Sequence, residues 1–109
     1  MIDAVLVLTT VPTADAGATL ARALVQARLA ACVNVLPPMT SIYRWKGELQ
    51  QDTECQLVVK TVRPRVDAVR ALVRQLHPYE LPEFVVVPVD GGDEADLAWL
   101  RSEASGEAG

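Results

Sequence analysis

The chain has 109 residues, of which 50% are apolar, and its formal net charge is −4. A chain of this length is expected to form one domain, here residues 1–109, and its apolar content favours a compact core over disorder. The acidic balance argues against a nucleic-acid partner, which needs a basic face, and no apolar run approaches the roughly 20 residues that span a membrane.

The chain opens with a strand pattern followed by a helix pattern. Residues 2–10 are rich in leucine and β-branched residues, which predicts a strand. Residues 13–31 are rich in alanine and leucine, which predicts a helix that Thr13 or Asp15 would cap. Its apolar face is expected to contain Leu20, Leu24, Ala27 and Ala31.

The middle of the chain has the pattern of a long, broken hairpin. Strand patterns at residues 31–36 and 40–45 are separated by two prolines, and a returning strand follows at 53–61. A turn signal, Lys-Gly-Glu, lies at 46–48. The hairpin is therefore expected to be longer than an ordinary pair of sheet strands.

The last third of the chain predicts helix, strand and helix. A helix is expected from Arg63 to Leu76, and its apolar face is expected to contain Val66, Val69, Val73 and Leu76. Residues 83–89 form a strand pattern. Asp93 is the expected cap of a terminal helix over 93–103, and residues 104–109 are expected to fray.

The order of these elements predicts an α+β fold of the ferredoxin-like kind. It is a split βαβ pair with an antiparallel sheet, an extended hairpin between the second and third strands, and an added C-terminal helix. Right-handed crossovers give the strand order 4-1-3-2. Pro88 would then lie in an edge strand, which tolerates its missing N–H group.

The first and last strands are apolar on both faces, although the two crossover helices of this fold cover one face alone. Leu6 and Leu8 alternate with Val5 and Val7, and the last strand is nearly continuous valine. Strands of this composition are normally covered on both sides. We therefore expect the open face to pack against copies of the same chain in a closed oligomer. Two aromatic residues of the hairpin, Tyr43 and Trp45, are suitable interface anchors.

Residues 31–61 and 76–89, with ACVN, SIYRWKGE, KT and HPYELPE in order, closely resemble the CutA family, which is named for divalent-cation tolerance. The likeness extends over residues 7–100. It implies a ferredoxin-like fold, a compact homotrimer built from long hairpins, and a role without catalysis in metal tolerance. It also implies binding of a divalent cation such as copper or zinc.

The chain departs from one metal-binding pattern of that family. Some members carry a cysteine at the end of the first strand and two adjacent histidines before Pro-Tyr. Here those positions hold Thr9, Leu76 and His77. A soft-metal site built from cysteine and imidazoles therefore cannot form there.

Three roles compete for the HPYELPE stretch, which contains the one histidine of the chain. His77 with Glu80 or Glu83 would hold a divalent ion if neighbouring subunits completed the site. Alternatively, His77 would serve as a general base, although no nucleophile is recognisable nearby. The interpretation that we favour is structural, because Pro78 ends the helix and an imidazole there satisfies a helix carbonyl.

Charged residues of the third strand suggest a cleft. Glu54 and Lys60 share one of its faces and need partners if they are partly buried. With Trp45, Tyr79 and Glu83 they predict a polar cleft for a small ligand between subunits. A salt-bridge network between subunits is the other interpretation, and it is the one that we favour for these charges.

A signalling trimer of the P-II kind, which binds a small molecule between subunits, is the alternative function. Its phosphate-binding loop would lie at the hairpin tip, residues 44–52, which is neither glycine-rich nor basic enough for that task. The chain start has no basic segment typical of a signal peptide, and the two cysteines form no CxxC pair. These features favour a cytoplasmic protein with reduced thiols.

Overall fold

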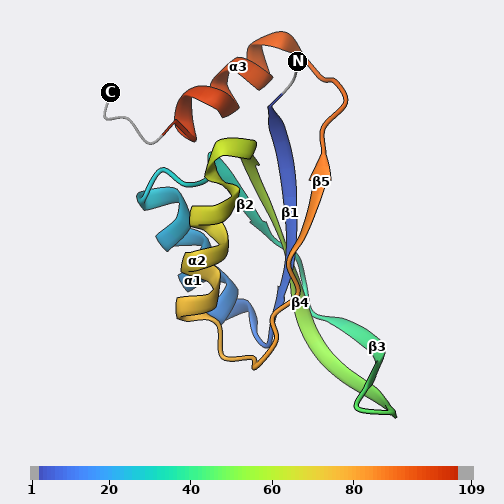
Figure 1. The fold of residues 1–109 in the computed structure, drawn as a ribbon. Coiled ribbons are helices and arrows are strands. Elements are labelled where there is room, and N and C mark those ends of the chain that lie inside the picture. The colour runs from blue at the N-terminus through green and yellow to red at the C-terminus, as the bar shows by residue number, and fades with distance from the viewer. Residues whose placement is uncertain (1–2, 106–109) are drawn as a thin grey trace.

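The computed structural model describes residues 3–105 and contains the predicted succession of elements (Figure 1). The fold is the predicted α+β arrangement of helices on an antiparallel sheet. Its elements are β1 (Ala4–Val11), α1 (Ala14–Gln26), β2 (Cys32–Val35), β3 (Met39–Trp45), β4 (Glu48–Val62), a 3-10 turn η1 (Arg63–Arg65), α2 (Val66–Leu76), β5 (Val85–Pro88) and α3 (Glu94–Glu103).

The sheet has the order β2-β4-β1-β5, and each of these pairs is antiparallel. This confirms the predicted order, with the first strand and the returning hairpin strand at the centre. Pro88 lies opposite Val5 in the edge strand β5, as expected. Cys32 and Cys55 are free thiols.

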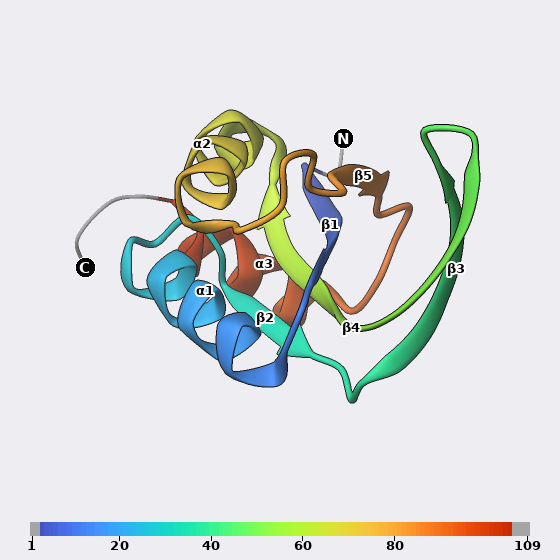
Figure 2. The ribbon, with the colours of Figure 1, turned by 90° about the horizontal axis from the view of Figure 1, so that it is seen from below.

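Helices α1 and α2 cover one face of the sheet and form the main core with it (Figure 2). Helix α1 lies very close to the sheet at Gly17. A Cβ atom there would lie 3.1 Å from side-chain atoms of Leu57, Val11 and Val35. The core between the helices and the sheet includes Val7, Leu20, Leu24, Cys55, Val59, Val69 and Val73.

The hairpin of β3 and β4 forms an arm that leaves the sheet. Strand β4 has 15 residues, and its first half pairs with β3 alone among the described strands. The arm turns at Lys46 and Gly47, whose φ angles are 51° and 80°, as a two-residue hairpin turn of the primed kind requires. The arm gives the molecule a length of 45 Å against widths of 26 and 23 Å (Figure 1).

Helix α1 is shorter than predicted. Thr13 caps it by accepting a hydrogen bond from the N–H of Ala16 at 3.1 Å, as expected, but the helix ends at Gln26 rather than at residue 31. Arg28 adopts a left-handed φ of 59°, which stops the helix. The N–H of Ala31 then donates to the carbonyl of Lys60 at 2.9 Å, so this residue already joins the sheet. Ala27 is exposed, and its predicted place on the apolar face is wrong.

The other crossover also differs from the prediction at its end. Leu76 is 44% exposed, because His77 takes the buried position at the end of α2 instead. Strand β5 starts at Val85, so residues 83–84 belong to the preceding loop. Phe84 still packs on the core, and Arg70 lies over its ring at 5.1 Å.

Helix α3 covers one end of the other sheet face. Asp93 caps it, as predicted, by accepting from the N–H of Asp96 at 3.1 Å. Leu100 packs against Ala4 and Val62, whereas Trp99 stays 48% exposed. Ala104 is buried, so the predicted fraying does not begin there; residues 106–109 of that prediction lie outside the described range.

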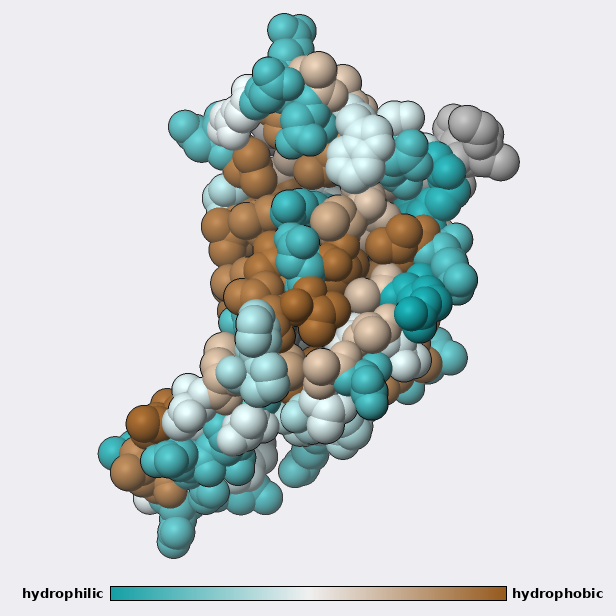
Figure 3. All heavy atoms as spheres, turned by 180° about the vertical axis from the view of Figure 1, so that it is seen from behind, coloured by the Kyte–Doolittle hydropathy of each residue, from teal (hydrophilic) through white to brown (hydrophobic). Residues whose placement is uncertain are grey.

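The rest of this face carries an apolar patch, which we call the open face. Register places Leu6, Leu8, Val58, Val85 and Val87 side by side on it. Figure 3 shows hydrophobic side chains gathered there below α3. All five are at least partly exposed, and Val85 is 48% exposed. Among residues 3–105, no helix has the length and apolarity needed to cross a membrane.

Candidate functional site

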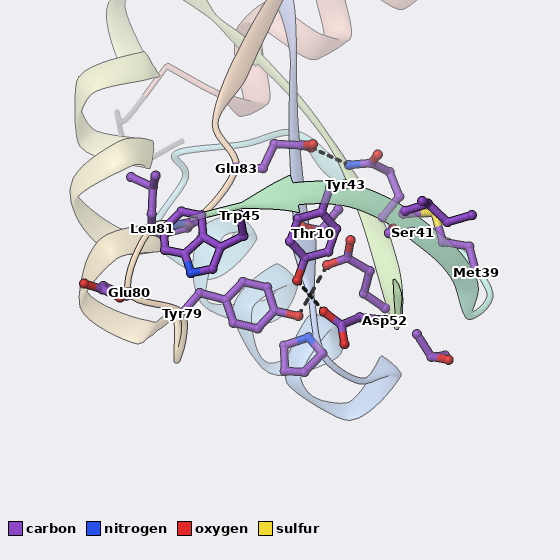
Figure 4. A pocket seen from close by; sticks show the side chains of 16 residues that line it. Thr10, Met39, Ser41, Tyr43, Trp45, Asp52, Tyr79, Glu80, Leu81 and Glu83 are labelled. Atoms are coloured by element: carbon purple, nitrogen blue, oxygen red, sulfur yellow. Dashed lines mark hydrogen bonds between the residues drawn. The ribbon is translucent and has the colours of Figure 1, made fainter. Parts of the chain in front are cut away.

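A cleft of about 1030 Å³ lies where the hairpin arm meets the loop between α2 and β5. One wall comes from the arm and includes Trp45, Tyr43 and Asp52, and the other comes from the loop at 79–83 (Figure 4). The end of β1 forms the base through Thr10. The cleft thus depends on the length of β4, since this strand continues from the sheet into the arm.

The lining of the cleft is acidic and aromatic. Its four carboxylates belong to Asp52, Glu54, Glu80 and Glu83, and no lysine or arginine of the described residues lines it. Glu80 lies on the outer side of the cleft, away from Asp52 (Figure 4). The nearby Lys46 lies over the ring of Trp45 at 5.6 Å, but the carboxylates predominate, and such a lining creates a negative potential that attracts cations.

Each of the two tyrosines in the cleft is paired with a carboxylate. The hydroxyl of Tyr79 donates to Oε1 of Glu54 at 3.3 Å, and that of Tyr43 donates to Oδ2 of Asp52. Burial, followed by the charge of Glu54 and this hydrogen bond, raises the pKa of Tyr79 to about 12. The hydrogen bond to Asp52 raises the pKa of Tyr43. Both phenols therefore stay neutral at pH 7 and donate to their carboxylate partners.

Replacing Glu54 by glutamine is expected to lower the pKa of Tyr79 from about 12 toward the usual value of about 10. The folded state of the wild-type protein holds the phenol proton more tightly than the unfolded state does. This contribution to stability is present below pH 10 and is lost between pH 10 and about 12. In the variant, the free energy of unfolding should therefore fall less steeply with rising pH over this window than in the wild-type protein. A Tyr79 titration that the substitution leaves unchanged would contradict the pairing.

Gln56 connects the cleft wall to the sheet. Its Nε2 donates to the carbonyl of Thr9 at 2.7 Å and to Oε2 of Glu83 at 3.2 Å. Glu83 is thereby held close to the start of β5, at the edge of the cleft (Figure 4).

His77 lies behind the cleft wall and is 9% exposed. Its Nδ1 accepts from the N–H of Tyr79 at 3.1 Å, and its Nε2 contacts the carbonyl of Thr10. The N–H of His77 donates to the carbonyl of Val73 at 2.8 Å and so ends α2. The histidine therefore joins α2, the end of β1 and the loop.

The cleft contains most of the predicted site residues. Trp45, Glu54, Tyr79 and Glu83 line it together, as does Glu80. Lys60 does not: it lies in the middle of the sheet, opposite Leu6 and Cys32 on the open face. The lining residues that were not predicted for the site include Asp52, Tyr43 and Gln56.

The residues present do not fit a metal ion at His77. Both ring nitrogens are engaged by the backbone, and Glu80, its proposed partner, is exposed on the outer side of the cleft. Within residues 3–105, no group of three or more histidine, cysteine or acidic side chains is arranged to hold a metal ion.

The family model of the CutA1 divalent ion tolerance protein matches residues 5–103. The chain belongs to this CutA family. It is 48% identical over 95 residues to the divalent-cation tolerance protein CutA of Thermus thermophilus, an alignment covering 87% of this chain and 92% of that protein. Solved CutA structures agree in fold. That of Cut A1 from T. thermophilus has a TM-score of 0.90 at 46% identity, covering 92% of this chain and 97% of the other. CutA from Xylella fastidiosa has a TM-score of 0.90 at 40% identity, covering 94% and 98%.

The relatives contradict the predicted cytoplasmic location. A CutA protein of Arabidopsis thaliana, 38% identical, is named chloroplastic, and an Archaeoglobus fulgidus structure, 29% identical, is titled periplasmic. This chain spans 56% of the Arabidopsis protein. Members in different compartments share the folded domain, so its composition and its free thiols do not determine where a member resides.

Proposed function

We propose that this CutA protein is a non-enzymatic homotrimer that acts in divalent-cation tolerance and binds a cationic ligand in the cleft. The proposal rests on the lining of the cleft, which includes four carboxylates and, among the described residues, no lysine or arginine. Glu54 is the most buried of these carboxylates at 9% exposure, and within residues 3–105 its carboxylate accepts one hydrogen bond, which comes from the neutral phenol of Tyr79. A buried carboxylate without a counter-charge is stabilised by a cation.

The chemistry of the donors selects the kind of cation. Carboxylate and phenol oxygens suit hard or borderline divalent ions, and zinc or copper(II) belongs to the borderline class. Because one copy holds no complete metal site within the described residues, the remaining donors would come from a neighbouring copy. The relatives named divalent-cation tolerance proteins support a role that involves such ions.

The apolar open face supports the trimer. Five aliphatic side chains lie together on this face, and no other described part of the chain covers them. Helix α3 covers only one end of the face. Complete burial of such an aliphatic side chain contributes roughly 1.5–3 kcal/mol, and an interface would add the share that is still exposed on each of them. The arm adds Ile42 and Leu49, which are 64% and 74% exposed and suit contact with a second copy.

The composition of the cleft supports a role in binding rather than catalysis. Ser41, Thr53 and Thr10 are its aliphatic hydroxyl residues, and none of them hydrogen-bonds a histidine or a carboxylate through its side chain within the described part of the chain. An activated nucleophile would need such a base. A nucleotide ligand of the P-II kind is also disfavoured, since its phosphates would meet carboxylates and no basic side chain among the described lining residues.

Calorimetric titration with Zn²⁺ and Cu²⁺ tests the proposal. We expect Glu54→Gln to weaken the affinity about tenfold or more, since even the loss of a supporting group around a metal ligand has that effect. Glu94→Gln is the matched control, because it removes one exposed acid at the start of α3. Equal weakening in both variants, or no binding to the wild-type protein at millimolar metal, would contradict the proposal.

A further inference from the structure

We propose that His77 is a positioning residue of the cleft, a neutral clasp that holds Tyr79 against Glu54, and that it is not a metal ligand. The inference rests on the proposed function only in assuming that the cleft, which His77 helps to shape, is where the ligand binds. It extends the structural interpretation of the HPYELPE stretch and argues against the alternative in which His77 holds a divalent ion.

The hydrogen bonds of His77 determine its tautomer. Nδ1 accepts from the N–H of Tyr79 at 3.1 Å and therefore carries no proton. In a neutral imidazole the proton then resides on Nε2, which is the atom that faces the carbonyl of Thr10. The ring thus accepts from the N–H of Tyr79 through Nδ1 and donates to the carbonyl of Thr10 through Nε2.

Neither nitrogen is free for a metal ion. A metal on Nδ1 would have to displace the N–H of Tyr79, and a metal on Nε2 would have to displace the proton that faces Thr10. Either change leaves a backbone group without a partner beside a ring that is 9% exposed. Metal binding at His77 would therefore break a contact that holds the loop at 79–83, which forms one wall of the cleft.

The clasp acts on the cleft through Tyr79. Pro78 stiffens the link between the two residues, and the rings of His77 and Tyr79 lie 4.6 Å apart at 52°. With its N–H held by Nδ1 and its ring packed on the imidazole, Tyr79 directs its hydroxyl to Glu54, 3.3 Å away on β4. His77 thus sets the distance between the loop and the arm from behind the cleft wall.

The first test is the ring itself. Because the chain holds one histidine, ¹⁵N-histidine labelling gives one pair of ring signals. We expect the Nε2–H tautomer in long-range ¹H–¹⁵N spectra, with both ring shifts unchanged when ZnCl₂ is added to about 1 mM, a concentration well above the range of specific metal sites. The Nδ1–H tautomer, or a zinc-induced shift of either ring nitrogen, would overturn the inference.

The same titration separates this inference from the proposed function. Zinc that binds the protein and leaves the ring signals unmoved supports both. Absence of zinc binding would end the proposed function, while the tautomer would still support the clasp. Zinc that binds and shifts the ring would overturn the clasp and leave a cation-binding function in place.

The second test compares two variants in a Tyr43→Phe background, where Tyr79 is the one remaining tyrosine of the chain. His77→Asn keeps an acceptor near the Nδ1 position, whereas His77→Phe keeps a ring without either polar atom. We expect the phenol pKa, about 12 in the wild-type protein, to stay raised in the asparagine variant and to fall toward its usual value in the phenylalanine variant. A role limited to stability would lower the melting temperature and leave this pKa alone. An unmoved pKa in a folded His77→Phe variant would overturn the inference; if that variant does not fold, the tautomer measurement decides.

Discussion

Replacing Val85 by aspartate is expected to convert the proposed trimer into monomers with a threefold lower mass. Val85 lies opposite Leu8 on the open face and is 48% exposed in the isolated chain. If a second copy covers this face, the substitution places a carboxylate among Leu6, Val58 and Val87, and Lys60 is two strands away on the same face. Desolvation of such a charge costs several kcal/mol, which exceeds what one interface residue normally contributes. Size-exclusion chromatography with light scattering measures the effect.

Val25→Asp provides the matched control. Val25 is 41% exposed, but it lies on α1, in the helix layer on the opposite face of the sheet. The control should keep the mass of the wild-type assembly. Loss of the assembly in both variants would indicate general destabilisation, and its survival in Val85→Asp would mean that the open face is not the contact surface.

Leu57→Ala is expected to lower the free energy of unfolding by about 2–5 kcal/mol, the range for a fully buried leucine. Leu57 is 0% exposed and lies in β4 beneath α1. Its side chain is in contact range of Gly17, where α1 packs closely on the sheet. The side chains of Val11 and Val35 contact the same position and stay in place, so they limit how far the helix can move into the cavity.

Urea unfolding at one fixed protein concentration measures this loss, because the stability of an oligomer depends on concentration. Leu76→Ala serves as the control, since this leucine is 44% exposed at the end of α2, and a change within about 0.5 kcal/mol is expected for a surface site. A loss of similar size in both variants would place the core elsewhere than beneath α1.

The fold was predictable because local patterns and topology agreed. The same sheet was indicated by the continuous apolar run of β1, the turn signal at Lys46 and Gly47, and the position of Pro88 in the last strand. The errors lie at element ends, where tertiary contacts decide. No local sequence signal indicates that Arg28 adopts a left-handed backbone conformation. His77, rather than Leu76, is buried at the end of α2 because the histidine contacts the distant backbone carbonyl of Thr10.

The cleft was predictable in part. Trp45, Glu54, Tyr79 and Glu83 belong to recognisable motifs, and the structure brings them together. Asp52 was missed although the two-residue turn pairs Ser41 with Asp52, which places this acid diagonally across from Tyr43 on the same face. That register could have been worked out from the turn.

The role of His77 and the place of Lys60 could not be derived in this way. The carbonyl that faces His77 belongs to Thr10, 67 positions earlier in the chain, so no local pattern connects them. Lys60 shares a sheet face with Glu54, but face alone does not place it in the cleft. The arm that forms one wall of the cleft begins near Glu54, whereas Lys60 lies in the part of β4 that belongs to the sheet.

Sedimentation equilibrium of the wild-type protein at low micromolar concentration tests most directly whether the open face is shared between copies. We predict a single species of three times the 11.8 kDa chain mass that persists on further dilution. A well-folded 11.8 kDa species would contradict this result, because the aliphatic side chains that β1, β4 and β5 present on the open face would then lie in water.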